Sequence, residues 1–204
     1  VAWAAIRILR QNPEANIIVS PSDQLVLNEL SFAHSIDVGI GYVSENRVLL
    51  AMGVKPTRPE PGYGYIQLGD LSCKPEVYKV KSFTEKPERD FARMFMESDE
   101  FYWNTGIFIS SAYHLLDTFE HVFPPVLRNL RNDNPNFTPE EEMKYVEENY
   151  PRYPNLSLDY AILEKSENNV YVMKCDFGWA DLGTWHSIYE VMHKVEDDNV
   201  VMDS

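Results

Sequence analysis

The first quarter of the chain alternates between helical and extended hydrophobic patterns. Residues 1–10 place Ala and Ile on one side and Arg on the other, which predicts an amphipathic helix. The apolar run at 16–20 (NIIVS) lacks polar alternation and predicts a short, buried parallel strand. A helix at 28–46 and a second buried strand at 47–54 follow, an order typical of an α/β sheet with crossover helices. The buried face of that helix is predicted to contain Leu30, Phe32, Ala33, Ile36 and Ile40.

The rest of the chain predicts further strands and helices. Residues 65–69 and 77–83 alternate well enough to form two strands that pair antiparallel. Residues 138–141 (TPEE) carry a cap residue, a proline and acidic residues in the order that begins a helix. The remaining predicted elements are a charged helix at 88–96, a strand at 101–109, helical segments interrupted by prolines within 112–149, a helix at 157–165, a strand at 169–175 and a closing helix at 184–193.

Composition limits the classes of partner. The 204 residues suit one domain or a little more, and 44% of them are hydrophobic, enough for a substantial core. The net charge of −14 would repel a nucleic-acid backbone, so general nucleic-acid binding is disfavoured. The apolar runs are too short to span a bilayer, and no signal-peptide pattern begins the chain. Cys73 and Cys175 lie far apart and indicate reduced thiols, so we expect a cytoplasmic protein without a membrane partner.

Two aspartates each follow a predicted buried strand. Asp23 comes just after the strand at 16–20, and Asp181 lies in the segment 176–185 (DFGWADLGTW) after the strand at 169–175. Ligands of open α/β sheets gather beyond the carboxyl ends of strands, and Mg²⁺ is commonly held by one or two carboxylates plus substrate phosphates. The alternatives are structural. Ser22 or Asp23 could cap the next helix, which is the favoured interpretation from Asp23 alone, and Asp181 could form a turn.

A loop rich in glycine and proline follows the second buried strand. Gly62 and Gly64 would let the main chain approach a ligand, and Tyr63 between them could stack or donate its hydroxyl. Lys55 and Arg58 add positive charge to an acidic protein. The alternative is an ordinary β-turn, because Gly-Tyr-Gly-Tyr alone is a weak signal.

Two shorter motifs offer groups that bind sugars and phosphates. In 83–87 (FTEKP), Glu85 can accept hydrogen bonds from sugar hydroxyls and Lys86 can pair with a phosphate. In 103–106 (WNTG), the amide of Asn104 can contact a hydroxyl from both sides. A surface ion pair and a turn are the respective alternatives. Each motif alone is ambiguous, whereas their joint occurrence in this order is not.

With these residues in view, the chain resembles the mannose-1-phosphate guanylyltransferases, also called GDP-mannose pyrophosphorylases. The matching stretches occur in the family's order and are NIIVSPSD, GVKPTRPEPGYGYIQ, FTEKP, YWNTGIFI, LDYAILEK and DFGWADLGTW. The resemblance implies a Rossmann-like nucleotide-diphospho-sugar transferase fold. Residues 1–204 would form one α/β nucleotidyltransferase domain, with a mixed, mostly parallel sheet and helices on both faces.

The resemblance also implies a reaction and roles for individual residues. Mannose 1-phosphate would attack the α-phosphate of GTP in line, releasing pyrophosphate and forming GDP-mannose, with Mg²⁺ as cofactor. The implied catalytic residues are Asp23, Lys86 and Asp181, of which Asp23 and Asp181 would be the Mg²⁺ ligands. The implied substrate-binding residues are Gly62, Tyr63, Glu85, Lys86 and Asn104.

The chain departs from the family's pattern mainly by an absence. The family's N-terminal signature, a Gly-rich loop followed by Arg and a Pro-Lys pair, does not occur in these residues. We therefore expect an N-terminally truncated domain with little or no activity by itself, and an open sheet edge at 16–20 that leaves homo-oligomer formation open. Smaller departures are Ser-Asp-Gln at 22–24, where the family has Ala-Asp-His, and Glu-Pro-Gly at 60–62, where it has Glu-Thr-Gly. Two alternatives remain: a related nucleotidyltransferase with another nucleotide or sugar, and a catalytically silent subunit that binds a sugar nucleotide.

Overall fold

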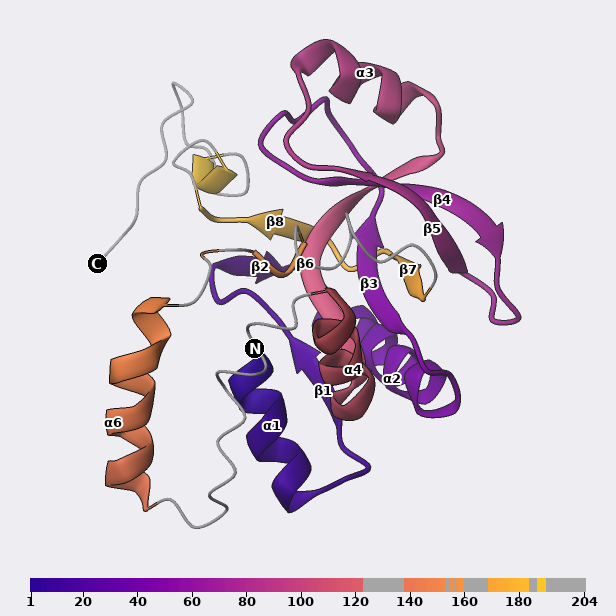
Figure 1. Cartoon of the computed structure of the whole chain (residues 1–204). Coiled ribbons are helices and arrows are strands. Elements are labelled where there is room, and N and C mark those ends of the chain that lie inside the picture. Colours follow the sequence, from indigo (N-terminus) through magenta and orange to yellow (C-terminus); the bar gives the residue numbers. More distant parts are fainter. Residues whose placement is uncertain (123–137, 153–154, 156, 160–168, 184–186, 190–204) are drawn as a thin grey trace.

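A computed structural model describes residues 1–122, 138–152, 155, 157–159, 169–183 and 187–189. In this part of the chain the strands form a large sheet in the order β1-β6-β3-β7-β5-β4, and a separate pair, β2 with β8 (Figure 1). The strands are β1 (Asn16–Val19), β2 (Gln24–Val26), β3 (Leu49–Val54), β4 (Tyr65–Leu71), β5 (Val77–Thr84), β6 (Phe101–Ser111), β7 (Val170–Cys175) and β8 (Trp179–Asp181).

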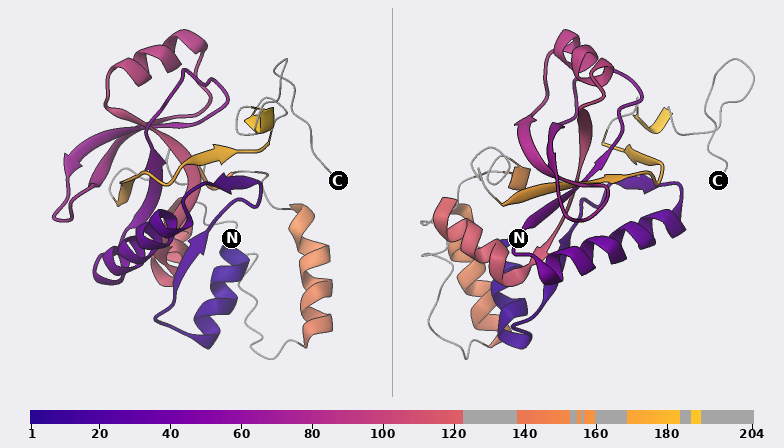
Figure 2. Two further views of the ribbon diagram at one scale, coloured as in Figure 1. Left: turned by 180° about the vertical axis from the view of Figure 1, so that it is seen from behind. Right: turned by 90° about the vertical axis from the view of Figure 1, so that its right-hand side faces the viewer.

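Helices cover both faces of the large sheet, as expected. Helices α1 and α4 pack against one face and α2 against the other, as the two views of Figure 2 show. The outer helix α6 packs on α1 through the stacked rings of Trp3 and Tyr145, whose centroids are 6.0 Å apart. The helices are α1 (Ala2–Gln11), α2 (Glu29–Glu45), α3 (Arg89–Glu97), α4 (Ala112–Val122) and α6 (Pro139–Asn149), followed by the 3-10 turn η1 (Tyr150–Arg152).

The sheet separates two hydrophobic clusters because successive strand residues point to opposite faces. On β3, Leu49 and Ala51 join the cluster beneath α1 and α4, whereas Leu50 and Met52 join the cluster beneath α2. Every residue of β3 is buried, which confirms the buried strand predicted at 47–54. Cys175, at the end of β7, is buried in the second cluster, and both it and the exposed Cys73 are free thiols.

The sheet is mixed, but the expectation that it is mostly parallel is wrong for the described strands. Only β3 and β7 pair parallel, and the other pairings of the large sheet are antiparallel. Strand β6 runs opposite to its neighbours β1, β3 and β4, and β5 runs opposite to β4 and β7. The antiparallel pairing predicted for 65–69 and 77–83 is confirmed in β4 and β5.

Strand β1 is not the buried parallel strand that its apolar run predicts. It pairs antiparallel with β6 alone and forms the edge of the described sheet, so its residues are half-buried and Ile18 is 43% exposed. The expected open edge at this strand is confirmed for the described residues. A continuous apolar run gives no information on strand direction or on the number of neighbours.

Helix α2 begins and ends where the sequence predicts, but its buried face differs. The Asn28 side chain caps it by accepting a hydrogen bond from the N–H of Ser31 at 3.0 Å. Leu30 is 84% exposed and Ala33 is also exposed, because the helix meets the sheet at its C-terminal part. Gly39 permits this approach, since a Cβ there would lie 2.5 Å from Cδ1 of Ile109.

Three further predictions concern the second half of the chain. The helix start at 138–141 is confirmed, because Thr138 and Glu141 form a reciprocal capping box. The helices predicted at 157–165 and 184–193 fall largely outside the described residues. Among the described helices, none combines the length and the apolar character that spanning a bilayer requires.

Candidate functional site

The strand pair β2–β8 brings the two aspartates together. Gln24 of β2 lies opposite Asp181 of β8, and the N–H of Leu182 donates to the carbonyl of Asp23 at 2.9 Å. Asp23 does not cap α2, since Asn28 does, so that interpretation is wrong. The turn at Asp181 is present, because its Oδ1 accepts from the N–H of Gly183 at 2.8 Å. Two carboxylates 158 positions apart in the printed sequence thus share one short ribbon.

A pocket of about 190 Å³ opens between this ribbon and the large sheet. Every site residue that the sequence predicts lines it, although the residues come from five separate segments of the chain. Its full lining consists of Pro21, Asp23, Gln24, Gly62, Tyr63, Gly64, Glu85, Lys86, Asn104, Thr105, Gly106, Asp159, Trp179 and Asp181.

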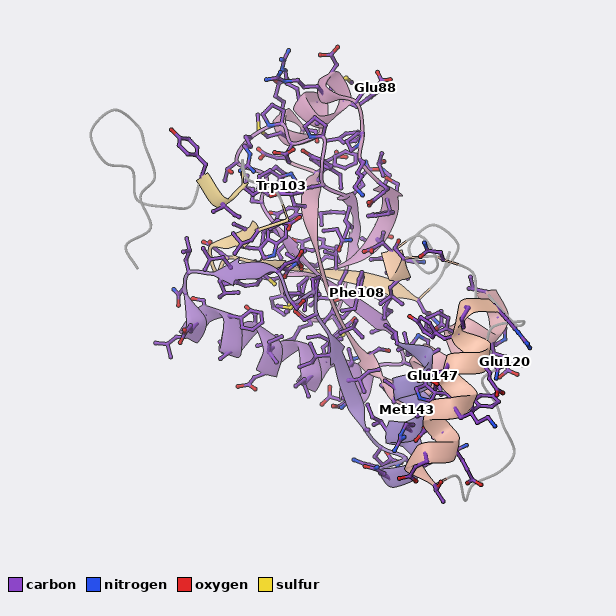
Figure 3. The ribbon with its side chains drawn as sticks, turned by 90° about the vertical axis from the view of Figure 1, so that its left-hand side faces the viewer. Glu88, Trp103, Phe108, Glu120, Met143 and Glu147 are labelled. Atoms are coloured by element: carbon purple, nitrogen blue, oxygen red, sulfur yellow. The ribbon has the colours of Figure 1, made fainter. Side chains whose placement is uncertain are left out.

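Aromatic packing holds the glycine-rich loop at the pocket wall. Tyr63 is buried and its ring makes edge contacts with Trp103 at 5.1 Å and Trp179 at 5.2 Å between centroids. Figure 3 shows Trp103 within the body of the molecule, on β6. The hydroxyl of Tyr65 donates to the carbonyl of Glu60 and accepts from its N–H, so this tyrosine fixes the loop's shape.

The loop cations do not reach the pocket. Lys55 pairs with Asp99 at 2.8 Å, and this contact raises the pKa of the lysine and lowers that of the aspartate. Arg58 pairs with Glu60 and lies over the ring of Trp103. Both charges are therefore paired at the loop, and the positive charge at the pocket comes from Lys86.

Glu85 and Lys86 follow β5 directly. Their side chains form an ion pair at 3.3 Å, as the surface-pair interpretation expects, and both also line the pocket. A Cβ at Gly64 would lie 2.9 Å from Oε2 of Glu85, so glycine at that position leaves room for the carboxylate. Lys86 has a φ of +46° and precedes the buried Pro87.

Asn104 is held on β6 by several contacts. Its N–H donates to the carbonyl of Gly64 at 2.8 Å, which joins the strand to the glycine-rich loop. Its side-chain Oδ1 accepts from the N–H of Gly106 at 3.1 Å, and its Nδ2 donates to Asp159. Gly106 has a φ of +72°, a conformation that favours glycine, but residues 103–106 lie inside the continuous strand β6, where the register with β3 shifts, so the turn interpretation is wrong.

Three further polar residues line the pocket without a predicted role: Gln24, Thr105 and Asp159. Gln24 donates from its Nε2 to the carbonyl of Thr105, which ties the β2–β8 pair to β6, and its Oε1 is buried without a partner in the described part of the chain. Asp159 lies in the matching stretch LDYAILEK but shows no chemical pattern of its own. Only the contact with Asn104, far away in sequence, reveals it.

The pocket is acidic. Asp23, Glu85, Asp159 and Asp181 supply four carboxylates against the ammonium of Lys86. Neither Asp23 nor Asp181 is paired with a basic side chain among the described residues. No group of three or more acidic, histidine or cysteine side chains with metal-binding geometry occurs there either. Asp23 and Asp181 both line the pocket, and carboxylates are the ligands that a hard divalent cation takes together with water and phosphate.

Comparisons with known proteins agree with this chemistry. Residues 1–198 match the family described as "Nucleotidyl transferase". The chain is 31% identical to an Escherichia coli protein named "Mannose-1-phosphate guanylyltransferase", over 98% of this chain and 44% of that protein. It thus spans less than half the length of the curated relatives it matches.

Two solved structures share the architecture. A crystal structure described as a mannose-1-phosphate geranyltransferase from Thermus thermophilus superimposes with a TM-score of 0.80 and 26% identity, over 94% of this chain and 54% of that one. A structure described as mannose-6-phosphate isomerase from Helicobacter pylori gives a TM-score of 0.68 and 25% identity, over 88% and 68% of the two chains. The α/β fold with a mixed sheet is therefore shared with enzymes of sugar phosphates.

Proposed function

Because this chain belongs to the nucleotidyl transferase family, we propose that the protein containing it is a mannose-1-phosphate guanylyltransferase. It joins GTP and mannose 1-phosphate to give GDP-mannose and pyrophosphate. The observation that carries the proposal is that one pocket is lined by Asp23, Asp181, Glu85, Lys86 and Asn104. The names of the similar proteins support the choice of substrates.

The residues divide the pocket into parts with different chemistry. Glu85 and the amide of Asn104 are suited to sugar hydroxyls, because a carboxylate accepts hydrogen bonds and an amide both donates and accepts. The ammonium of Lys86 binds the sugar phosphate as a point charge. Gly62 and Tyr63 border the space for the sugar nucleotide. The ligand is thereby held with its phosphate toward the lysine and the aspartate pair.

In the transfer, an oxygen of the sugar phosphate bonds to the α-phosphorus of GTP while the bond from that phosphorus to pyrophosphate breaks. The protein residues supply positioning and charge stabilisation, and no covalent enzyme intermediate is required. Asp23 and Asp181 would hold Mg²⁺, which neutralises charge on the phosphates when bound. Lys86 balances part of the remaining negative charge at the sugar phosphate.

The test measures pyrophosphate release by the complete protein with GTP and mannose 1-phosphate. We expect Asp181→Asn to lower kcat roughly 100-fold or more, because a metal-bound carboxylate is lost at the reacting phosphates. Asp176→Asn is the matched control, since Asp176 is exposed, lies in the same segment and does not line the pocket. It should leave turnover near the wild-type rate.

The same measurement with other nucleotides and sugar phosphates tests specificity. Turnover that favours UTP or glucose 1-phosphate over GTP and mannose 1-phosphate would replace the proposed activity by that of a related nucleotidyltransferase. Binding of GDP-mannose without turnover of any substrate pair would indicate a silent binding subunit. Near-normal activity of Asp181→Asn would remove its role as metal ligand.

A further inference from the structure

Asp159 is the pocket carboxylate whose role neither the sequence motifs nor the proposed reaction assigns. It lies between η1 and β7, is half-buried, and lines the pocket. Its Oδ1 accepts a hydrogen bond of 2.5 Å from Nδ2 of Asn104, which lies 55 residues earlier in the sequence. The contact joins two polar side chains of the pocket that are distant in the sequence.

This contact fixes which way the Asn104 amide faces. With Nδ2 donating to Asp159 and Oδ1 accepting from Gly106, both ends of the amide are assigned by their partners. The strand is itself held, since Thr105 donates from Oγ1 to the carbonyl of Met52 at 2.8 Å. Within the part of the chain that the structure describes, the second N–H of the Asn104 amide has no partner, so it can donate to a ligand beside the carboxylate of Asp159.

The carboxylate of Asp159 also retains unused acceptors. Its contact with Asn104 is its one polar contact among the described residues, so its second oxygen has no protein partner there. A carboxylate can accept several hydrogen bonds, so the one that Asn104 donates leaves acceptor capacity for a ligand in the pocket. A ligand group that enters the pocket and carries donor hydrogens would bond to the second oxygen of Asp159.

The chemistry of the pocket identifies that group as a hydroxyl. A phosphate would be repelled by Asp159 and finds its partner in Lys86 instead. A metal ion would need Asp159 to cluster with the aspartate pair, and the described residues form no such group of three. Sugar hydroxyls carry donor hydrogens without negative charge, which matches a carboxylate placed next to an amide N–H.

We propose that Asp159 is a substrate-binding residue that accepts a hydrogen bond from one sugar hydroxyl and orients Asn104 toward a neighbouring hydroxyl. The proposal rests on the proposed function and specifies which hydroxyl contacts select the sugar phosphate. Asp159 and Asn104 would together contact two hydroxyls of the sugar ring, so removal of either hydroxyl leaves one half-buried side chain without its partner.

Two variants separate the two roles. In Asp159→Asn the new amide can turn its oxygen toward Asn104 and keep that bond, which places an NH₂ donor where the ligand needs an acceptor. In Asp159→Ala both contacts are lost. Asp37→Asn is the matched control, because Asp37 is exposed on α2 and does not line the pocket. Thermal unfolding of each variant shows whether it is folded.

The experiment measures kcat and KM of the complete protein for mannose 1-phosphate and for its 2-, 3-, 4- and 6-deoxy analogues, at saturating GTP. We expect Asp159→Asn to raise the KM for mannose 1-phosphate about 10- to 100-fold, as for a lost hydrogen bond to a charged group. The KM for GTP should change little. One deoxy analogue should have a higher KM than mannose 1-phosphate with the wild type. With Asp159→Asn the KM values of that analogue and of mannose 1-phosphate should be similar.

The outcomes distinguish the inference from the proposed function. Unchanged KM values and unchanged deoxy penalties in a folded Asp159→Asn would overturn the hydroxyl contact, even if the wild type turns over normally. Impairment of Asp159→Ala alone would reduce Asp159 to a positioning residue for Asn104 and would likewise contradict the proposal. A wild type without any activity on sugar phosphates would remove the proposed function and this inference together.

Discussion

Lys86 combines a ligand-facing side chain with an unusual backbone. Its φ of +46° lies in the left-handed region, where the Cβ of an L-residue is crowded. The residue before a proline also normally adopts an extended conformation, and Pro87 follows. Strained residues of this kind persist where the surrounding structure holds them, and they cluster at functional sites. Pro87 is buried and fixes the chain directly after Lys86, whereas the exposed ion pair with Glu85 contributes little.

The strain predicts an unusual stability order at this position. Lys86→Gly should be about 0.5–1 kcal/mol more stable to unfolding than Lys86→Ala. Glycine relieves a steric cost of roughly 1–2 kcal/mol in the folded state. This gain is larger than the free energy that glycine costs through its extra flexibility in the unfolded chain. Denaturant titration of both variants measures the difference. The same two substitutions at Lys81, in the extended strand β5, should rank in the opposite order. Equal stability at position 86 would contradict the strain.

At the level of elements, the ribbon β2–β8 controls the distance between the two aspartates. The ladder continues beyond the strands, since the N–H of Leu27 donates to the carbonyl of Gly178 at 2.8 Å. Gly178 has a φ of +62°, and a Cβ there would lie 2.8 Å from Cβ of Leu27. The ribbon therefore requires glycine at this position for two independent reasons.

Gly178→Ala should loosen the ribbon and separate Asp23 from Asp181. We expect the free energy of unfolding to fall by about 1–2 kcal/mol from the backbone conformation alone. The Mg²⁺ concentration for half-maximal turnover should rise. The control is Gly41→Ala in α2, where a Cβ meets nothing within 4 Å, so stability should increase by roughly 0.5–1 kcal/mol. An unaltered Mg²⁺ requirement in Gly178→Ala would show that the ribbon does not set the metal site.

Elements and site were predictable from the sequence to different degrees. Local signals were sufficient for the bounds of α2, although its cap is Asn28 and not Asp23, and for the buried strand β3. The direction of β1 and the exposure of Leu30 depend on which neighbours the strand and helix meet, which no local pattern records. Motifs located the pocket, but the role of Asp159 required the contact with Asn104.

For the molecule as a whole, the two-sided core includes one titratable group that lacks a partner. His114, on α4, is 5% exposed, and its Nε2 forms no hydrogen bond within the described part of the chain. Burial lowers its pKa, with Asp117 opposing and Arg47 adding to the shift. The neutral ring is therefore favoured in the folded state, whereas the unfolded chain binds a proton near the ordinary histidine value.

The protein should consequently lose stability in mild acid. Above pH 6.5 the ring is neutral in both states and the full stability is present, and below it the unfolded state takes up a proton that the folded state resists. The free energy of unfolding of the wild type should fall between about pH 7.5 and 5.5, and His114→Leu should show a smaller fall. His34→Leu, at an exposed position of α2, serves as control. Equal pH dependence in the wild type and His114→Leu would exclude His114 as the cause.

The two cysteines differ enough to act as internal reporters of different events. Burial raises the pKa of Cys175 to about 12, so at neutral pH almost no reactive thiolate forms in the folded protein. Cys73 is exposed and open to alkylating reagents. In a single labelling reaction, the alkylation of Cys73 therefore measures the total amount of protein. The alkylation rate of Cys175 measures how often the carboxyl end of β7 opens. This end of the strand leads directly into the ribbon that carries Asp181.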